Sequence, residues 1–183
     1  MSGDPRGRST SETEGKRAGC SYSFSNWLNS SGGPLVMMEE RKAHLWTGVN
    51  GTTADYEVAC QSDDYASQIL SHGANVLILG DEPLQTMVAI GSGVQLLVRW
   101  KWADSDADVR SAIEQLDLSA ASPIETLAIN WPSESLVIFD SADTFNPAAN
   151  LKFSASVGMN AVSTFIHEPT PRLSLLIHAV RAM

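Results

Sequence analysis

The side chains that could carry out acid–base chemistry are scattered along this chain. They are His44, His72, Asp81, Glu82, Asp140, His167 and His178. Two carboxyl groups can hydrolyse a substrate when one donates a proton and the other acts as base or nucleophile. Asp81 and Glu82 are adjacent, however, so on a strand their side chains would point in opposite directions. A small hydrolytic or ligand-binding enzyme that uses Asp81, Glu82 and Asp140 is therefore an alternative hypothesis and not the favoured one.

Motifs for nucleophiles, phosphates and metals are incomplete. Ser141 follows Asp140, but no Gly-x-Ser-x-Gly motif surrounds any serine. The glycine-rich stretch 29–34 has no lysine at the spacing of a phosphate-binding loop, and we interpret it as a hairpin turn. No two histidines have the spacing of metal ligands on one predicted helix. We therefore predict no catalytic residue, no metal and no cofactor.

Three alternating acids follow the middle of the chain and resemble the start of a calcium-binding loop. They are Asp104, Asp106 and Asp108. Such a loop needs glycine at its sixth position and glutamate at its twelfth, where this chain has Val109 and Gln115. Ser105 with an acid three residues later is instead typical of a helix N-cap. We predict a helix after Ser105, because apolar residues recur at helical spacing from Val109 to Leu116.

The composition is that of a soluble, acidic globular protein. The chain has 183 residues, 43% hydrophobic and 18% charged, and a net charge of −9. This charge argues against nonspecific nucleic-acid binding, which needs a basic surface. It would suit a basic protein partner, although solubility alone is an equally good explanation. No run is long enough to span a bilayer, so we expect no membrane partner.

The ends and the cysteines bear on location. Residues 1–24 contain few apolar residues, and we predict that they form a disordered tail before a single domain at 25–183. No signal peptide is visible, so the expected location is the cytoplasm. Cys20 and Cys60 are expected to be reduced, with Cys60 as a small core residue.

The stretch 75–102 is the expected centre of the fold. It contains three apolar segments separated by turns, which predict an antiparallel meander of three strands. In the last strand, alternation places Val98, Trp100 and Trp102 on an apolar inner face. Arg99 and Lys101 are expected on a basic outer face.

The remaining pattern predicts mostly strands joined by short turns. Further strands are expected at 26–28, 35–38, 124–131, 136–139, 151–156, 161–166 and 173–179. A hairpin is expected to join the first two, and Thr53 to cap a short helix that contains Tyr56 and Ala59. His178 falls out of phase with its apolar neighbours and is expected to be exposed. The predicted class is α+β, with a largely antiparallel sheet and two or three short helices packed on it.

A series of short motifs in a fixed order carries a resemblance to a known family. The motifs are Trp27, Ser30-Ser31-Gly32-Gly33-Pro34-Leu35, Trp46-x-Gly48, Asp55-Tyr56-x-x-Ala59-Cys60, Leu79-Gly80-Asp81-Glu82-Pro83-x-x-Thr86, Arg99-Trp100, Ala103-Asp104-Ser105 and Asp140-Ser141-Ala142. Together they resemble the Imm21 family of bacterial immunity proteins over about residues 26–180. The resemblance implies a cytoplasmic antitoxin that binds and blocks the cognate toxin of a polymorphic toxin system. It implies no catalysis and no cofactor.

The acidic charge suggests how such an antitoxin would bind. Many toxins that attack nucleic acids have basic clefts, and an acidic surface can imitate phosphate charge and speed association. The candidate toxin-binding acids are Asp63, Asp64, Asp81, Glu82, Asp104, Asp106 and Asp108. Trp46 and Trp102 are the candidate anchors if they are exposed, although tryptophan is more often a core residue. Charge reversal at Asp63, Asp81 or Asp106 is expected to slow association at low salt.

Overall fold

The computed structural model describes residues 21–51, 55–80 and 82–183. One sheet contains β1 (Ser23–Phe24), β5 (Thr86–Gly91), β6 (Val94–Trp102), β7 (Glu125–Trp131), β10 (Gly158–Thr170) and β11 (Leu173–Ala182). The other contains β2 (Leu35–Glu39), β3 (Ala66–Ser71), β4 (Ala74–Leu79), β8 (Ser135–Asp140) and β9 (Leu151–Ser154). The helices are α1 (Glu40–Ala43), the 3-10 turn η1 (Gly48–Asn50), α2 (Asp55–Ala59) and α3 (Asp106–Glu114). Among the described residues, no helix has the length and apolar character needed to cross a membrane.

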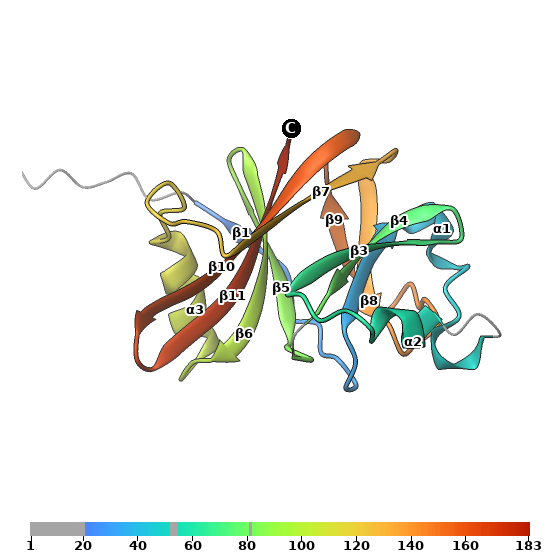
Figure 1. Cartoon of the computed structure of the whole chain (residues 1–183). Coiled ribbons are helices and arrows are strands. Elements are labelled where there is room, and N and C mark those ends of the chain that lie inside the picture. Colours follow the sequence, from blue (N-terminus) through green and yellow to red (C-terminus); the bar gives the residue numbers. More distant parts are fainter. Residues whose placement is uncertain (1–20, 52–54, 81) are drawn as a thin grey trace, which may run out of the picture.

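The two sheets pack against each other with short helices on their outer faces (Figure 1). Within the described residues the strand orders are β1-β5-β6-β11-β10-β7 and β3-β4-β2-β8-β9, and every paired strand is antiparallel. Helix α3 covers the six-stranded sheet, while α1 and α2 cover the five-stranded sheet. The predicted α+β class is confirmed, but its strands are divided between two sheets.

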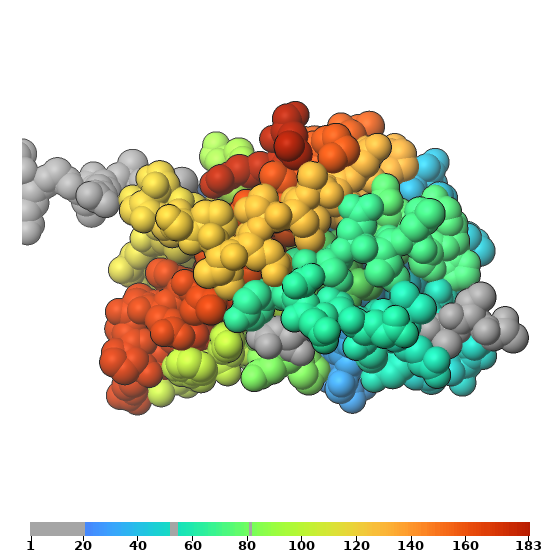
Figure 2. All heavy atoms as spheres, in the orientation of Figure 1, coloured from blue at the N-terminus to red at the C-terminus, as the bar shows by residue number. Residues whose placement is uncertain are grey.

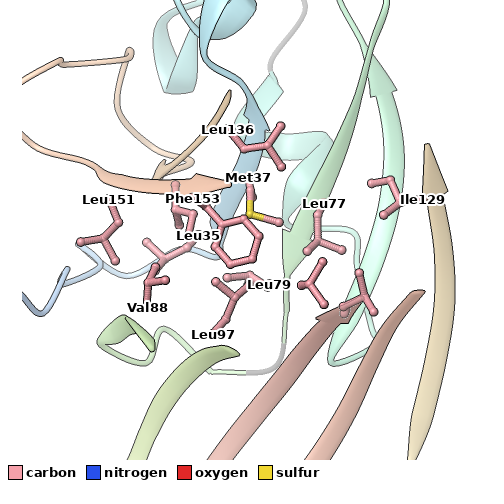
Figure 3. Close-up of a cluster of buried hydrophobic side chains, with 14 of the residues drawn as sticks. Leu35, Met37, Leu77, Leu79, Val88, Leu97, Ile129, Leu136, Leu151 and Phe153 are labelled. Atoms are coloured by element: carbon pink, nitrogen blue, oxygen red, sulfur yellow. The ribbon is translucent and has the colours of Figure 1, made fainter. Parts of the chain in front are cut away.

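The main hydrophobic core lies between the sheets (Figure 3). Leu35, Met37 and Leu77 enter it from the five-stranded sheet, and Val88 and Leu97 enter it from the other. Each of these side chains is at most 1% exposed. Because α3 covers the opposite face of the six-stranded sheet, its central strand β11 is buried continuously from residue 173 to residue 180.

The predicted three-stranded meander is wrong at its first step. β5 and β6 form the expected hairpin, but β4 pairs with β2 and β3 in the other sheet. The Gly80 N–H still donates to the Tyr65 carbonyl oxygen at 3.0 Å. The Leu84 N–H donates to the Glu82 carbonyl oxygen at 2.7 Å. β4 therefore ends at Leu79 in one sheet and β5 begins at Thr86 in the other, without a tight hairpin turn between them.

Several expectations about burial are also wrong. Arg99 and His178, both expected outside, are 0% exposed because the second face of their strands packs against the other sheet. Cys60, expected in the core, is exposed because α2 ends at Ala59.

A β-bulge changes the predicted face of Trp102. Trp100 pairs with Leu175 and Trp102 pairs with Ser174, so Lys101 is an extra residue in β6. Cross-strand partners share a face of the sheet. Trp102 therefore lies on the face of Ser174 and not on that of Trp100.

The start of the domain differs from the prediction. Residues 1–20 of the predicted tail, with Cys20, lie outside the described residues, as does the predicted cap Thr53. Ser23 and Phe24 form β1 against β5, so the end of the predicted tail belongs to the sheet. Leu28 makes a bridge to Thr86 at the end of the same sheet, instead of a hairpin with β2.

Candidate functional site

Segments that are far apart in the sequence meet at one end of the sandwich. A pocket of about 190 Å³ is lined by Gly32, Gly33, Pro34, Ala59, Cys60, Ser62, Gly80 and Pro83. These residues come from the loop before β2, the end of α2 and the crossing between β4 and β5. Three of the motif segments noted in the sequence therefore form one surface.

Close backbone approach explains the glycines of this surface. A Cβ atom at Gly33 would lie 2.5 Å from the Tyr56 ring and 3.3 Å from Ser141 Oγ. A Cβ atom at Gly80 would lie 2.2 Å from the Asp64 carbonyl oxygen. The nearest atom at each position is closer than real Cβ contacts allow, so only glycine lets these loops pack together.

Asp140 holds the glycine-rich loop in place. Its Oδ2 accepts the Ser31 N–H and its Oδ1 accepts the Ala142 N–H at 3.0 Å. Beside it, the Cys60 thiol, burial and the Asp140 charge together raise the pKa of the Tyr56 hydroxyl. Asp140 therefore acts as a structural acceptor at the end of β8.

The enzyme hypothesis gains no geometric support. Asp140 lines a second pocket of about 340 Å³, but Glu82 is not among the residues that line it. Asp81 lies outside the described residues. Among the described residues, no group of three or more His, Cys, Asp or Glu side chains is placed to hold a metal ion.

The buried Arg99 side chain forms hydrogen bonds to the backbone around the end of β4. Its guanidinium donates to the carbonyl oxygens of Gly80 at 2.6 Å, Glu82 at 2.6 Å and Leu79 at 3.3 Å. Carbonyl groups at the end of a strand would otherwise lack strand partners. The guanidinium group carries several N–H donors and can therefore donate to all three carbonyl oxygens at once. The alternation pattern of β6 gave no sign of this role.

A series of hydrogen-bonded side chains holds the neighbouring loop at residues 63–66. Glu125 on β7 accepts the Tyr65 and Ala66 N–H groups at 3.2 and 2.7 Å, and the Thr164 hydroxyl at 3.3 Å. Thr164 Oγ1 lies 2.9 Å from His178 Nδ1. Burial and the Arg99 charge hold the pKa of His178 well below its ordinary value, so the imidazole is neutral. The loop at residues 63–66 therefore leads into β3 of the five-stranded sheet and is hydrogen-bonded to β7 of the six-stranded sheet.

The acidic candidates fall into two groups. Asp63, Asp64 and Glu82 are exposed beside the crossing between the sheets. Asp104, Asp106 and Asp108 lie at the start of α3. In Figure 2 the teal segment with the loop before β3 and the orange-red turn between β10 and β11 lie on the same face. We call Asp63, Asp64 and Glu82 the acidic rim.

The two groups differ in how their carboxylates are used. Asp106 accepts from Arg110 at 2.7 Å and from the Trp27 indole at 2.6 Å, and the Arg110 hydrogen bond, opposed by burial, lowers its pKa. Asp104 pairs with Arg172 at 2.7 Å, and Asp108 accepts from Ser105. In the described part of the chain, the Asp63 and Asp64 carboxylates have no such partner. The carboxylates of Asp63 and Asp64 thus differ from those at the start of α3, which are held in local pairs.

The two tryptophan candidates have opposite environments. Trp46 is 1% exposed, donates its indole N–H to the Ser141 carbonyl at 2.9 Å and packs edge-on against Phe139. Trp46 is a core residue, so it does not have the exposure that a toxin-binding anchor needs. Trp102 is 46% exposed and stays a candidate.

Asp55 in α2 forms a cluster that alternation and motif spacing did not predict. Its carboxylate accepts from Thr47 N–H at 2.9 Å, Thr47 Oγ1 at 2.8 Å and Ser71 Oγ at 2.8 Å, and lies 2.9 Å from His72 Nε2. Burial opposes ionisation, but the hydrogen bonds from His72, Thr47 and Ser71 outweigh it and lower the pKa of Asp55. The cluster joins α2 to the β3–β4 turn, where His72 has a φ of 51°.

We expect Asp55→Asn to lower the free energy of unfolding by about 1–3 kcal/mol at pH 7. A carboxyl whose folded pKa is depressed stabilises the protein above its unfolded pKa of about 3.9, and this stabilisation is lost as the pH falls through the folded value. Urea unfolding at a series of pH values should therefore show the difference between wild type and variant shrinking below about pH 4. Asp63→Asn, at an exposed carboxylate, is the control. Parallel pH curves for wild type and Asp55→Asn would contradict the role of this cluster.

A comparison with protein families agrees with the motif series. Residues 26–165 match the family model described as Immunity protein 21, Imm21. The match ends within β10, earlier than the residue 180 expected from the motifs. No curated protein and no solved structure matches the chain significantly.

Proposed function

Because this chain belongs to the immunity protein 21 family, we propose that it neutralises a cognate toxin by binding it and covering the surface with which the toxin acts. The observation that carries this proposal is the family match over residues 26–165, which includes every motif segment at the candidate site. The protein acts by binding and not by catalysis, in the cytoplasm of the cell that it protects. Its partner is a toxin of a polymorphic toxin system.

The acidic rim is the proposed contact surface. Its carboxylates are exposed, and the loops that carry them are held by Arg99 and Glu125. A rigid acidic surface loses little conformational entropy on binding. It also attracts a basic cleft from a distance, because opposite potentials speed association. A basic, nuclease-like toxin is the partner that this surface suits best.

The proposal is tested by expressing the gene immediately upstream and co-expressing this chain. We expect the upstream product to stop growth, co-expression to restore growth, and the two proteins to purify as a one-to-one complex. A frameshifted copy of the immunity gene is the control, because it keeps the transcript but not the protein. A toxic neighbour that this protein neither binds nor neutralises would contradict the proposal.

Charge reversal in the acidic rim tests the contact surface. Asp63→Lys and Glu82→Lys should each slow association with the toxin by about threefold to tenfold at low salt, and by less at high salt because screening weakens the attraction. Stopped-flow association rates at two salt concentrations measure the effect. Glu114→Lys, on the exposed side of α3, is the matched control because it changes the net charge equally. Equal rates for all three variants would place the contact elsewhere.

A further inference from the structure

The edge strand β3 lacks the features that protect the other edges of the sandwich. In the described structure the two sheets end at β1, β7, β3 and β9. β1 has two residues, and β9 has four with Lys152 among them. On β7, the Asn130 carbonyl oxygen accepts the Asn75 Nδ2 at 2.7 Å. β3 has six residues, Ala66–Ser71, none of them charged, and the segment that contains it lies at the surface in Figure 2. Proteins usually shorten, charge or cover an exposed edge, so β3 is the edge best suited to accept another strand.

The backbone groups of Gln68 and Leu70 point away from the sheet. In an antiparallel ladder the N–H and C=O of one residue point to the same side, and successive residues alternate. The Tyr65 carbonyl faces β4, because it accepts the N–H of the residue after that strand at 3.0 Å. The Ala66 N–H faces outward and donates to Glu125 on β7 at 2.7 Å. Gln68 and Leu70 follow Ala66 at steps of two, so their backbone groups also face outward.

The side chains at this edge are accessible as well. Gln68 is exposed, and Leu70 is 74% exposed. An exposed leucine on an uncharged edge strand loses contact with water if a second strand pairs beside it, which favours pairing. The edge therefore offers both hydrogen-bonding groups and apolar surface.

The edge is complementary to itself across a two-fold axis. If two β3 strands lie antiparallel with Gln68 opposite Leu70 of the second copy, both residues form hydrogen-bonded pairs. Ile69 then lies opposite Ile69 of the second copy, in the closer pair type that brings apolar side chains into contact. A two-fold interface uses the same patch on both subunits, so this one edge is sufficient. The two five-stranded sheets would become one continuous sheet.

The charges at the two ends of β3 also favour antiparallel pairing. Asp63 and Asp64 precede the strand and are exposed. At its other end the Lys42 Nζ donates to the Gly73 carbonyl oxygen in the β3–β4 turn. Asp55, an acid at this turn, is 5% exposed and is enclosed by its own hydrogen bonds. Antiparallel pairing brings the acidic end of each strand beside the Lys42 end of the other, so opposite charges meet twice.

We propose that two copies of this protein associate through their β3 strands in this arrangement. The second copy covers Leu70 and lies beside Asp63 and Asp64. Because those two carboxylates also belong to the acidic rim, association of two copies and binding of the toxin exclude each other, and a one-to-one toxin complex forms from separated copies. That consequence rests on the proposed function, but the association itself does not.

The association is tested by sedimentation equilibrium between about 1 µM and 1 mM protein. We expect a dimer whose fraction rises with concentration. Leu70→Lys should weaken it by about tenfold or more, because a lysine on an edge opposes strand pairing. Ile90→Lys, at a 47% exposed position in β5 of the other sheet, should change it less than about twofold. Thermal unfolding checks that both variants fold. A protein that stays monomeric throughout, or equal effects of the two substitutions, would overturn the second copy as occupant and leave the edge to a strand of another protein.

Amide hydrogen exchange tests the backbone pairing without any substitution. The Gln68 and Leu70 N–H groups should exchange more slowly as the protein concentration rises. The Ser67 and Ile69 N–H groups face β4 and should change little, so they serve as internal controls. Exchange at Gln68 and Leu70 that does not depend on concentration would contradict the proposed strand pairing.

The antiparallel arrangement is tested by exchanging the charges. Asp64→Lys and Lys42→Glu each place like charges together at both contacts of a dimer of that variant, and each should weaken it by about threefold or more. In an equimolar mixture of the two variants, each contact again joins a cation to an anion. The mixed dimer should therefore be tighter than the dimer of either variant alone. A mixture that associates no better than the separate variants would overturn the arrangement.

Discussion

We expect the Arg99→Leu variant to lose about 3 kcal/mol or more of its free energy of unfolding. Arg99 is 0% exposed and donates to the carbonyl oxygens of Leu79, Gly80 and Glu82. Leucine fills much of the same volume but leaves these acceptors without donors in the interior, where unsatisfied polar groups are costly. Urea unfolding followed by tryptophan fluorescence measures the change. The loop at 80–85 should also become accessible to proteolysis at lower urea concentrations.

Arg172→Leu is the matched control for this prediction. The Arg172 side chain is 79% exposed and pairs with Asp104 at the surface, so its removal should cost less than about 1 kcal/mol. Comparable losses for the two variants would mean that the buried hydrogen bonds of Arg99 contribute little.

The second large effect is expected at Gly48. This residue has a φ of 59°, and a Cβ atom there would lie 2.4 Å from the Ala142 carbonyl oxygen and 2.8 Å from the Asp143 carbonyl carbon. Both neighbours are backbone atoms that cannot rotate away. We expect Gly48→Ala to lower the free energy of unfolding by about 2–4 kcal/mol, combining backbone strain with overpacking. Thermal unfolding followed by circular dichroism measures this loss.

Gly93→Ala separates these two causes. Gly93 has a φ of 77° in the β5–β6 turn, but nothing lies within 4 Å of the position that a Cβ atom would take there. The same substitution therefore tests backbone strain alone, which costs about 1–2 kcal/mol. If Gly48→Ala cost no more than Gly93→Ala, the close packing of η1 against residues 142–143 would not be important for stability.

Local elements could be predicted because their signals lie within a few residues. Ser105 accepts the Asp108 N–H at 3.2 Å and starts α3 as expected, and Val109 and Ile113 are buried on its inner face. The β5–β6 hairpin also forms, with its positive φ at Gly93. The strand expected at 124–131 forms as β7, and its alternate residues Ile129 and Trp131 lie in the core.

The division into two sheets could not be predicted from such signals. Alternation shows that a strand has two faces, but it does not show what covers each face. Arg99 and His178 lie on strands covered on both sides, so an out-of-phase polar residue was interpreted as exposed. The hydrogen-bond partners that make their burial tolerable come from residues far away in the sequence, and no local pattern reveals them.

The motif order indicated the family, but it did not predict the pocket to which the structure brings Gly33, Cys60 and Gly80. The acids at the start of α3 are largely used in local pairs, which composition alone could not show. Asp55 and Asn160 carried no recognisable signal, because their roles depend on hydrogen bonds that only the folded chain creates.

The central position of β11 has a consequence for the timing of folding during synthesis. Of the strands in the described structure, β11 is made last, yet it lies between β6 and β10 in the middle of its sheet. While the ribosome is still completing these residues, β6 and β10 expose open edges that invite pairing with other chains. The six-stranded sheet can close only after β11 leaves the ribosome, so this sheet forms in one late step and not gradually during synthesis.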